Sequence, residues 1–169
     1  MLHSSMTRVA PLVICTLTLF VWVDPGEAAK RKKKSSAKAD AACVEAFKRA
    51  LELEKEEQYL PARKVLYDCA HSKCGALIKR KCNVRYFVVR RATPSVIPTA
   101  TDENGDRMTD VEVTMDGQLL TPYTDGQAIE VNPGVHEFSF SDEKGIIAKK
   151  NVEIAPGQKN LRVAVSKGR

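Results

Sequence analysis

The chain has 169 residues, a formal net charge of +6 and five cysteines. This length allows one ordinary domain or two small ones, and only ten aromatic residues (five Phe, four Tyr and one Trp) exclude a large core. Residues 30–91 carry 18 Lys and Arg against 7 Asp and Glu, a net of +11, whereas residues 92–169 carry 8 against 12, a net of −4. The charge therefore indicates two units that meet near residue 92.

The N-terminus has the pattern of a targeting segment. Arg8 precedes the uncharged run Val9–Val23, which is shorter than the roughly 20 apolar residues of a bilayer span. Gly26 and Ala28 occupy the positions that small residues favour before a cleavage site. We therefore predict a signal peptide over residues 1–28. The alternative is an uncleaved anchor, which the basic run after it favours because such runs stay on the cytoplasmic side.

Removal of the leader leaves four cysteines: Cys43, Cys69, Cys74 and Cys82. An even number of cysteines in a short exported chain favours disulfides. The cysteines therefore argue against an anchored protein that faces the cytoplasm. We expect an exported protein, either periplasmic or on the outer envelope or outside the cell.

Residues 29–39 are rich in Lys, Ala and Ser and have nothing to bury, so we predict a disordered basic linker. It is either a spacer or a contact with an anionic surface such as a phospholipid membrane. That contact would use Lys30, Arg31, Lys32, Lys33 and Lys34. No nucleic acid partner is expected, because no aromatic residues interleave with these charges to stack on bases.

Residues 40–92 are predicted to form a helical domain that contains all four cysteines. Asp40 can cap a helix to about Glu57, a second helix spans about 60–70, and a third begins near Gly75 and ends before Pro94. The spacing of Ala50, Leu53, Tyr59, Ala62, Leu66 and Cys69 resembles one tetratricopeptide unit. One such unit cannot bury its own face, so the third helix should cover it with Leu77, Ile78, Val84, Tyr86, Phe87 and Val88.

Four cysteines allow three disulfide connectivities. A helix that contained both Cys74 and Cys82 would separate them by ~12 Å along its axis, beyond the ~7 Å limit between Cα atoms for a disulfide. This disfavours a Cys74–Cys82 bond. We favour Cys43–Cys74 with Cys69–Cys82, because that pairing links each helix to a non-adjacent partner, but the spacing alone leaves the other connectivity open.

Residues 93–169 are predicted to form an antiparallel β-sandwich. Strand-like segments include 111–115, 129–131, 136–140, 146–154 and 161–165, and dipeptides such as Asp116-Gly117 and Pro133-Gly134 mark turns between them. Six or seven short strands at this spacing are typical of a sandwich. The complete chain is thus expected to be an α+β protein.

The C-terminal unit resembles the PEGA-type module of bacterial surface proteins. The resemblance rests on Val131-Asn132-Pro133-Gly134-Val135-His136-Glu137-Phe138, then Gly145, then Ile154-Ala155-Pro156-Gly157-Gln158. From residue 95 onward the chain is also similar to transthyretin-like or carboxypeptidase-regulatory-like sandwiches, and the whole arrangement resembles exported bacterial proteins with a Cys-containing helical hairpin. The PEGA motif itself is only partly present, as PGVH. The resemblance implies an envelope protein with a binding or structural role.

No candidate for catalytic or metal chemistry has a convincing pattern. Cys69, His71, Cys74 and Cys82 could ligate zinc, but their spacing matches no standard finger. The segment 102–106 has calcium-loop oxygen spacing but lacks the later glycine and glutamate, so an Asn-Gly turn is expected. His136 is interpreted as structural. Because no hydrolase, metalloprotease or phosphate-loop motif occurs, we predict no catalytic residues, no metal and no cofactor.

The sequence thus predicts a non-catalytic exported envelope protein that acts as a protein- or surface-interaction or structural module. Its partner would be a protein or an envelope polymer. The alternative is a charge-driven binder of anionic envelope polymers or a membrane surface through its basic half.

Overall fold

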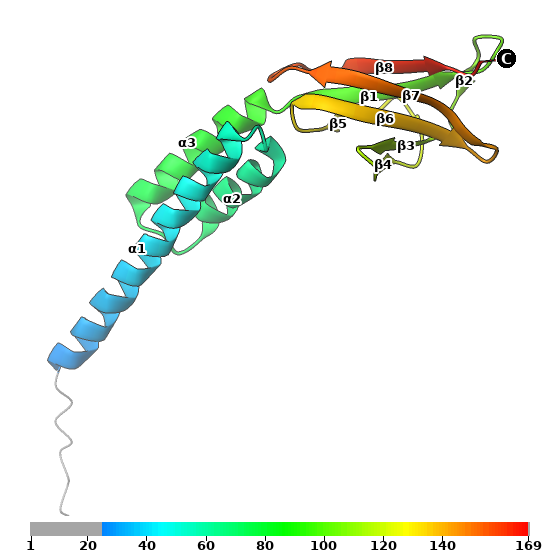
Figure 1. The fold of residues 1–169 in the computed structure, drawn as a ribbon. Coiled ribbons are helices and arrows are strands. Elements are labelled where there is room, and N and C mark those ends of the chain that lie inside the picture. Colours follow the sequence, from blue (N-terminus) through cyan, green and yellow to red (C-terminus); the bar gives the residue numbers. More distant parts are fainter. Residues whose placement is uncertain (1–24, 169) are drawn as a thin grey trace, which may run out of the picture.

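A computed structural model describes residues 25–168, and residues 1–24 and Arg169 lie outside this description. The chain has the predicted α+β architecture, with a three-helix unit followed by a two-sheet unit placed end to end (Figure 1). The predicted leader lies outside the described residues, apart from residues 25–28. No helix in the described range has the length and apolarity that a bilayer span requires.

The helices are α1 (Pro25–Lys55), α2 (Tyr59–His71) and α3 (Ala76–Ala92). Their core contains the small and apolar residues that recur at helical spacing, as the sequence predicts for the first two helices. Ala50 and Leu53 of α1 and Ala62, Leu66 and Cys69 of α2 are buried, together with Cys82 and Val89 of α3.

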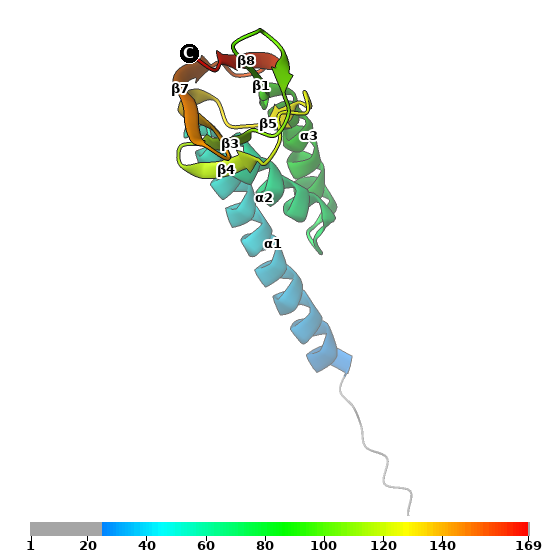
Figure 2. The same ribbon diagram turned by 90° about the vertical axis from the view of Figure 1, so that its right-hand side faces the viewer.

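α1 differs from its predicted boundaries. The sequence predicted a disordered linker over residues 29–39 and a helix start at Asp40, but α1 begins at Pro25 and includes this whole segment. Ala and Lys favour helices, and no glycine or proline lies between Gly26 and Pro61. α1 therefore projects well beyond the ends of α2 and α3, as Figures 1 and 2 show.

Asp40 lies inside α1 and not at its start. Its Oδ1 atom accepts a hydrogen bond of 2.9 Å from the backbone N–H of Gly75, the residue that precedes α3. The side chain that was predicted to cap the first helix thus satisfies a donor at the start of the third.

The second unit contains eight strands in two four-stranded sheets. In the first sheet, β1 (Ser95–Thr101) is the central strand. It pairs with β8 (Leu161–Ser166) along one edge and with the short strands β2 (Arg107–Met108) and β5 (Ile129–Glu130) along the other. The second has the order β4-β3-β6-β7, with bounds Gln118–Thr121, Glu112–Met115, Gly134–Asp142 and Gly145–Ile154.

The two sheets enclose one apolar core between them. Its largest fully buried members are Phe138 and Phe140 of β6, which alternate with outward-facing residues as the sequence predicts. The remaining buried core residues come from both sheets and their loops: Val96, Ala100, Val111, Val113, Val131, Ile154 and Val163.

One strand pair departs from the predicted antiparallel arrangement. β1 and β8 are parallel over six residue pairs, from Val96 opposite Leu161 to Thr101 opposite Ser166. Such a pair cannot be joined by a hairpin. Here the rest of the sandwich supplies the long connection between the two strands.

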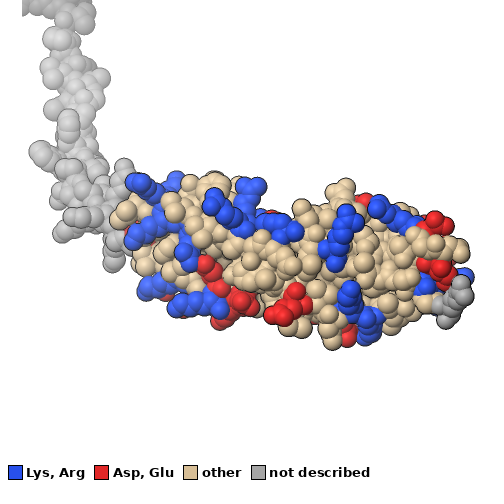
Figure 3. Space-filling model, turned by 90° about the horizontal axis from the view of Figure 1, so that it is seen from above, with Lys and Arg blue, Asp and Glu red and all other residues tan. Residues whose placement is uncertain are grey.

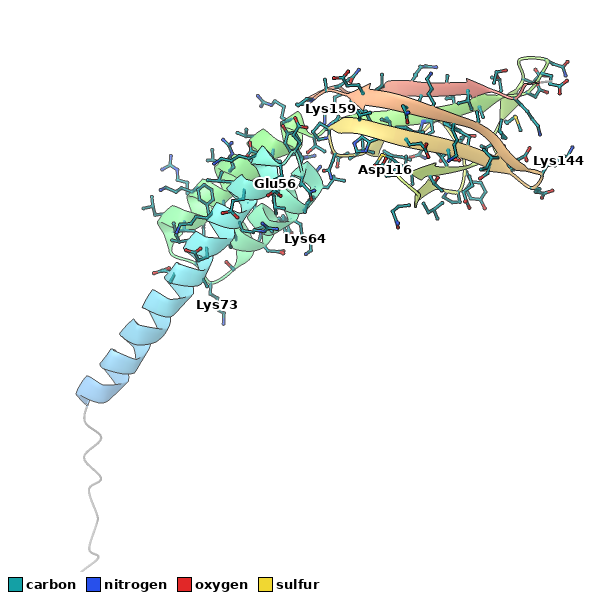
Figure 4. The ribbon with its side chains drawn as sticks, in the orientation of Figure 1. Glu56, Lys64, Lys73, Asp116, Lys144 and Lys159 are labelled. Atoms are coloured by element: carbon teal, nitrogen blue, oxygen red, sulfur yellow. A yellow bond between two sulfur atoms is a disulfide. The ribbon has the colours of Figure 1, made fainter. Side chains whose placement is uncertain are left out.

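Backbone and side-chain hydrogen bonds join the helical unit to the sandwich at two places. After α3, the Gly157 N–H donates to the Ala92 carbonyl (2.6 Å), and the Lys159 ammonium donates to the Thr93 carbonyl. At the start of α2, the Leu60 N–H donates to Asn132 Oδ1 (2.9 Å), and Arg63 pairs with Glu130 (2.5 Å). Lys159 is labelled at the first of these junctions in Figure 4.

Candidate interaction surface

The four cysteines lie in two pairs with disulfide geometry, Cys43 with Cys74 and Cys69 with Cys82. In each pair the Cα atoms are 6.0 Å apart, within the range that a disulfide spans. The first pair joins α1 to the loop before α3, and the second joins α2 to α3. This is the connectivity that the sequence analysis favoured, and it ties all three helices together at one end.

The predicted anionic-surface residues and the candidate zinc ligand His71 lie in different parts of the helical unit. Lys30–Lys34 lie in the part of α1 that projects from the bundle. His71 stacks on Tyr67, with ring centres 4.1 Å apart, and its Nδ1 atom lies 2.8 Å from the Tyr67 carbonyl oxygen. In the described part of the chain, no three His, Cys, Asp or Glu side chains are arranged to hold a metal ion.

α3 carries two seams of residues, on different sides of the helix. The inner seam, Ile78-Cys82-Arg85-Val89, packs against the other two helices. The outer seam, Leu77-Lys81-Val84-Val88-Arg91, faces solvent, and Phe87 and Arg80 flank it. We call these last seven residues the outer face of α3.

The outer face of α3 is unusually apolar for an exposed helix surface. Leu77 is 69% exposed, Val84 58% and Val88 47%. Together with Phe47 of α1, these residues line a groove of about 490 Å³. A second groove of about 480 Å³ continues from Val88 and Phe87 to Pro156 and Gly157 of the sandwich. Contiguous apolar surface of this kind marks interaction sites.

The same face is basic. α3 contains six Lys and Arg and no Asp or Glu. Within residues 40–168, no carboxylate lies within ion-pair distance of Arg80, Lys81 or Arg91. Figure 3 shows Lys and Arg side chains over the helical half of the molecule, with uncharged surface between them. An apolar groove with cations both within and beside its apolar residues suits an anionic, amphipathic ligand.

His136 takes part in a hydrogen-bonded chain that reaches the helical unit. Its Nδ1 atom lies 2.7 Å from Asp116 Oδ2, and its Nε2 atom lies 3.1 Å from the Asn132 carbonyl oxygen. The Asn132 side chain in turn accepts from the Leu60 N–H of α2. Burial opposes ionisation of Asp116, but hydrogen bonds from His136 and from the Glu137 N–H hold the pKa of this carboxyl below its usual range. Both ring nitrogens of His136 thus have partners within the protein.

The sequence pattern did not predict the outer face of α3. It assigned Leu77, Val84, Phe87 and Val88 to the core, but these side chains are exposed, and Cys82 and Val89 are the fully buried residues of α3. The signal that could have found the surface is the spacing 77-81-84-88-91, a second heptad seam in which two positions are cationic.

Comparison with protein-family models gives no match, and comparison with curated proteins gives no significant match.

Proposed function

We propose that this chain is a non-catalytic envelope protein, exported after cleavage near Ala28, whose role is to bind another protein as an interaction or structural module. The observation that carries this proposal is the outer face of α3, an exposed apolar surface on a bundle held by two disulfides. A helical platform that carries an exposed apolar groove and is linked by two disulfides is suited to binding a partner.

The likeness of the C-terminal unit to PEGA-type and transthyretin-like modules, and of the hairpin to a tetratricopeptide unit, supports the same role. In this proposal the sandwich braces the platform through the hydrogen bonds at Ala92 and Leu60. The partner then lies on the helical unit.

Site-specific photo-cross-linking in the native host tests the proposal. A photoreactive residue in place of Val84 should cross-link to a protein of the envelope fraction. The matched control is Val135, which is 72% exposed on the sandwich and should not cross-link to the same protein. Equal cross-linking from both positions would refute the proposed surface, and N-terminal sequencing of the mature chain tests cleavage at Ala28.

A second candidate function is charge-driven binding of an anionic envelope polymer or membrane surface. It is favoured by the +11 charge of residues 30–91 and by the five consecutive cations Lys30–Lys34. Salt separates the two functions, since charge-driven binding weakens steeply with ionic strength and a packed apolar interface does not.

A further inference from the structure

The spacing of the outer face of α3 points to a helical ligand. Leu77, Lys81, Val84, Val88 and Arg91 follow one another at intervals of four, three, four and three residues. This is the heptad interval with which one helix packs along another. Phe47 of α1 also lines this groove, so two helices bound it.

The inner seam of the same helix indicates which charge that ligand carries. Arg85, in the middle of the inner seam, donates two hydrogen bonds to the Glu54 carboxylate of α1, at 2.7 and 2.5 Å. Where α1 packs on α3, a glutamate of α1 thus neutralises the cation in the inner seam of α3. Lys81 and Arg91 are the cations of the outer seam, and no carboxylate within residues 40–168 lies within ion-pair distance of them.

Charge and position disfavour the other occupants. A second copy that packed its outer face of α3 against this one would bring Arg80, Lys81 and Arg91 of each copy together, with no acidic residue on either α3 between them. A bilayer suits a helix whose cations flank its apolar stripe. Here Lys81 interrupts the stripe between Leu77 and Val84, where a carboxylate on an opposing helix can meet it directly.

Resting on the proposed function, we infer that the outer face of α3 binds an acidic amphipathic helix of another protein, with apolar residues against Leu77, Val84 and Val88 and carboxylates against Lys81 and Arg91. The ligand would add a fourth helix to the bundle.

The probe is a fluorescent synthetic helix of about three heptads with Leu at the seam positions and Glu beside them. A second peptide has the same seam with Lys in place of Glu, and a third arm uses phosphatidylglycerol vesicles. Fluorescence anisotropy with the full mature protein should give saturable binding of the acidic peptide. The basic peptide should bind at least tenfold more weakly, because like charges then oppose each other.

Two variants and two matched controls locate the site. Val84→Ser removes a seam contact and Lys81→Glu reverses a seam charge, and each should weaken the acidic peptide roughly tenfold. Val135→Ser and Lys144→Glu make the same changes on the sandwich, where Lys144 lies at the far tip (Figure 4), and should leave binding unchanged. Unchanged circular dichroism and the absence of labelled thiols verify that each variant is folded.

Equal binding of both peptides, or full binding by Val84→Ser, would overturn the inference. Vesicle binding that is lost in Val84→Ser, without binding of the acidic peptide, would assign the surface to lipid instead. If the peptide fails while Val84 still cross-links to an envelope protein, the interaction role stands and only the class of partner is wrong. If both experiments fail, the proposed function fails as well.

Discussion

Among individual residues, the cysteines of the two disulfides differ in their surroundings. Cys69 and Cys82 are 3% and 0% exposed and belong to the helical core, whereas Cys74 lies nearer the surface, where its Sγ atom is 2.6 Å from Ser72 Oγ. Both bonds close loops, over 13 residues for Cys69–Cys82 and 31 for Cys43–Cys74. Their removal should therefore have unequal effects.

We predict that all four mature cysteines are oxidised. Cys43→Ala/Cys74→Ala should lower the free energy of unfolding by about 2–4 kcal/mol, because the unfolded chain gains conformational entropy when the disulfide is absent. Cys69→Ala/Cys82→Ala should cost more, because it also leaves a cavity in the core. Denaturant unfolding followed by helical circular dichroism measures both. Free thiols in the native protein, or a larger cost for removal of Cys43–Cys74 than of Cys69–Cys82, would contradict this prediction.

The lowered pKa of Asp116 makes the stability of the fold depend on pH. This pKa is lower in the folded state than in the unfolded chain. The ionised carboxylate therefore stabilises the fold at pH values above the ordinary carboxyl pKa near 4. This contribution is lost as the pH falls from about 4 through the folded pKa. The side chain is 51% exposed, so solvent screening limits the effect to about 1 kcal/mol or less.

Asp116→Asn is the test, because Asn tolerates the left-handed backbone that Asp116 adopts (φ 52°). The change removes the charge and keeps one acceptor oxygen, which can still accept from the Glu137 N–H. The variant should be less stable than the wild type at neutral pH and lose less stability below pH 4. The hydrogen bond from Lys167 also lowers the pKa of Asp142, but Asp142 is present in both proteins, so it does not change the comparison. Identical acid unfolding curves would refute a role for Asp116.

Among the helices, α2 takes one of its capping interactions from the other unit. Gln58 precedes α2 but makes no side-chain capping hydrogen bond. The Leu60 N–H in the first turn donates instead to Asn132, which belongs to the loop between β5 and β6. A free N–H at a helix start is normally satisfied by a neighbour in sequence, so this contact couples the two units.

We predict that Asn132→Ala destabilises the helical unit by about 1 kcal/mol, the usual effect of a lost cap. Hydrogen exchange should accelerate at Leu60 and at the neighbouring amides of α2, although the substitution lies in the sandwich. Asn151→Ala, a change of the same kind at an exposed position of β7, should leave these amides unaffected. No acceleration in Asn132→Ala would indicate that water replaces the cap at no cost.

The sequence predicted those elements whose patterns are local. Ala62, Leu66 and Cys69 lie buried at helical spacing, and Phe138 and Phe140 alternate into the sandwich core, as expected. It did not predict which seam of α3 is covered, because the two seams repeat at nearly the same interval and tertiary packing decides between them. The β1–β8 pairing joins residues more than 60 positions apart, which no local pattern encodes.

In the whole molecule, positive charge is concentrated in the helical half and its projecting α1. We predict that binding to anionic vesicles, if the second candidate function is correct, depends on the five residues 30–34. Replacing all five with Ser should weaken binding strongly at low salt, since each cation near an anionic surface contributes about 1 kcal/mol. Sedimentation with vesicles measures this. Unchanged binding would reduce the segment to a spacer.

The contact between Asn132 and α2 also bears on the order in which the protein matures. A chain is synthesised from its amino end, so residues 40–92 exist before the loop that caps α2 has been made. During this interval α2 has no side-chain cap at its first turn, and oxidation of the cysteines can already tie it to α3. The arrival of residues 130–132 then closes the open turn. The first turn of α2 can therefore gain this cap only after Asn132, some 70 residues later in the chain, has been made.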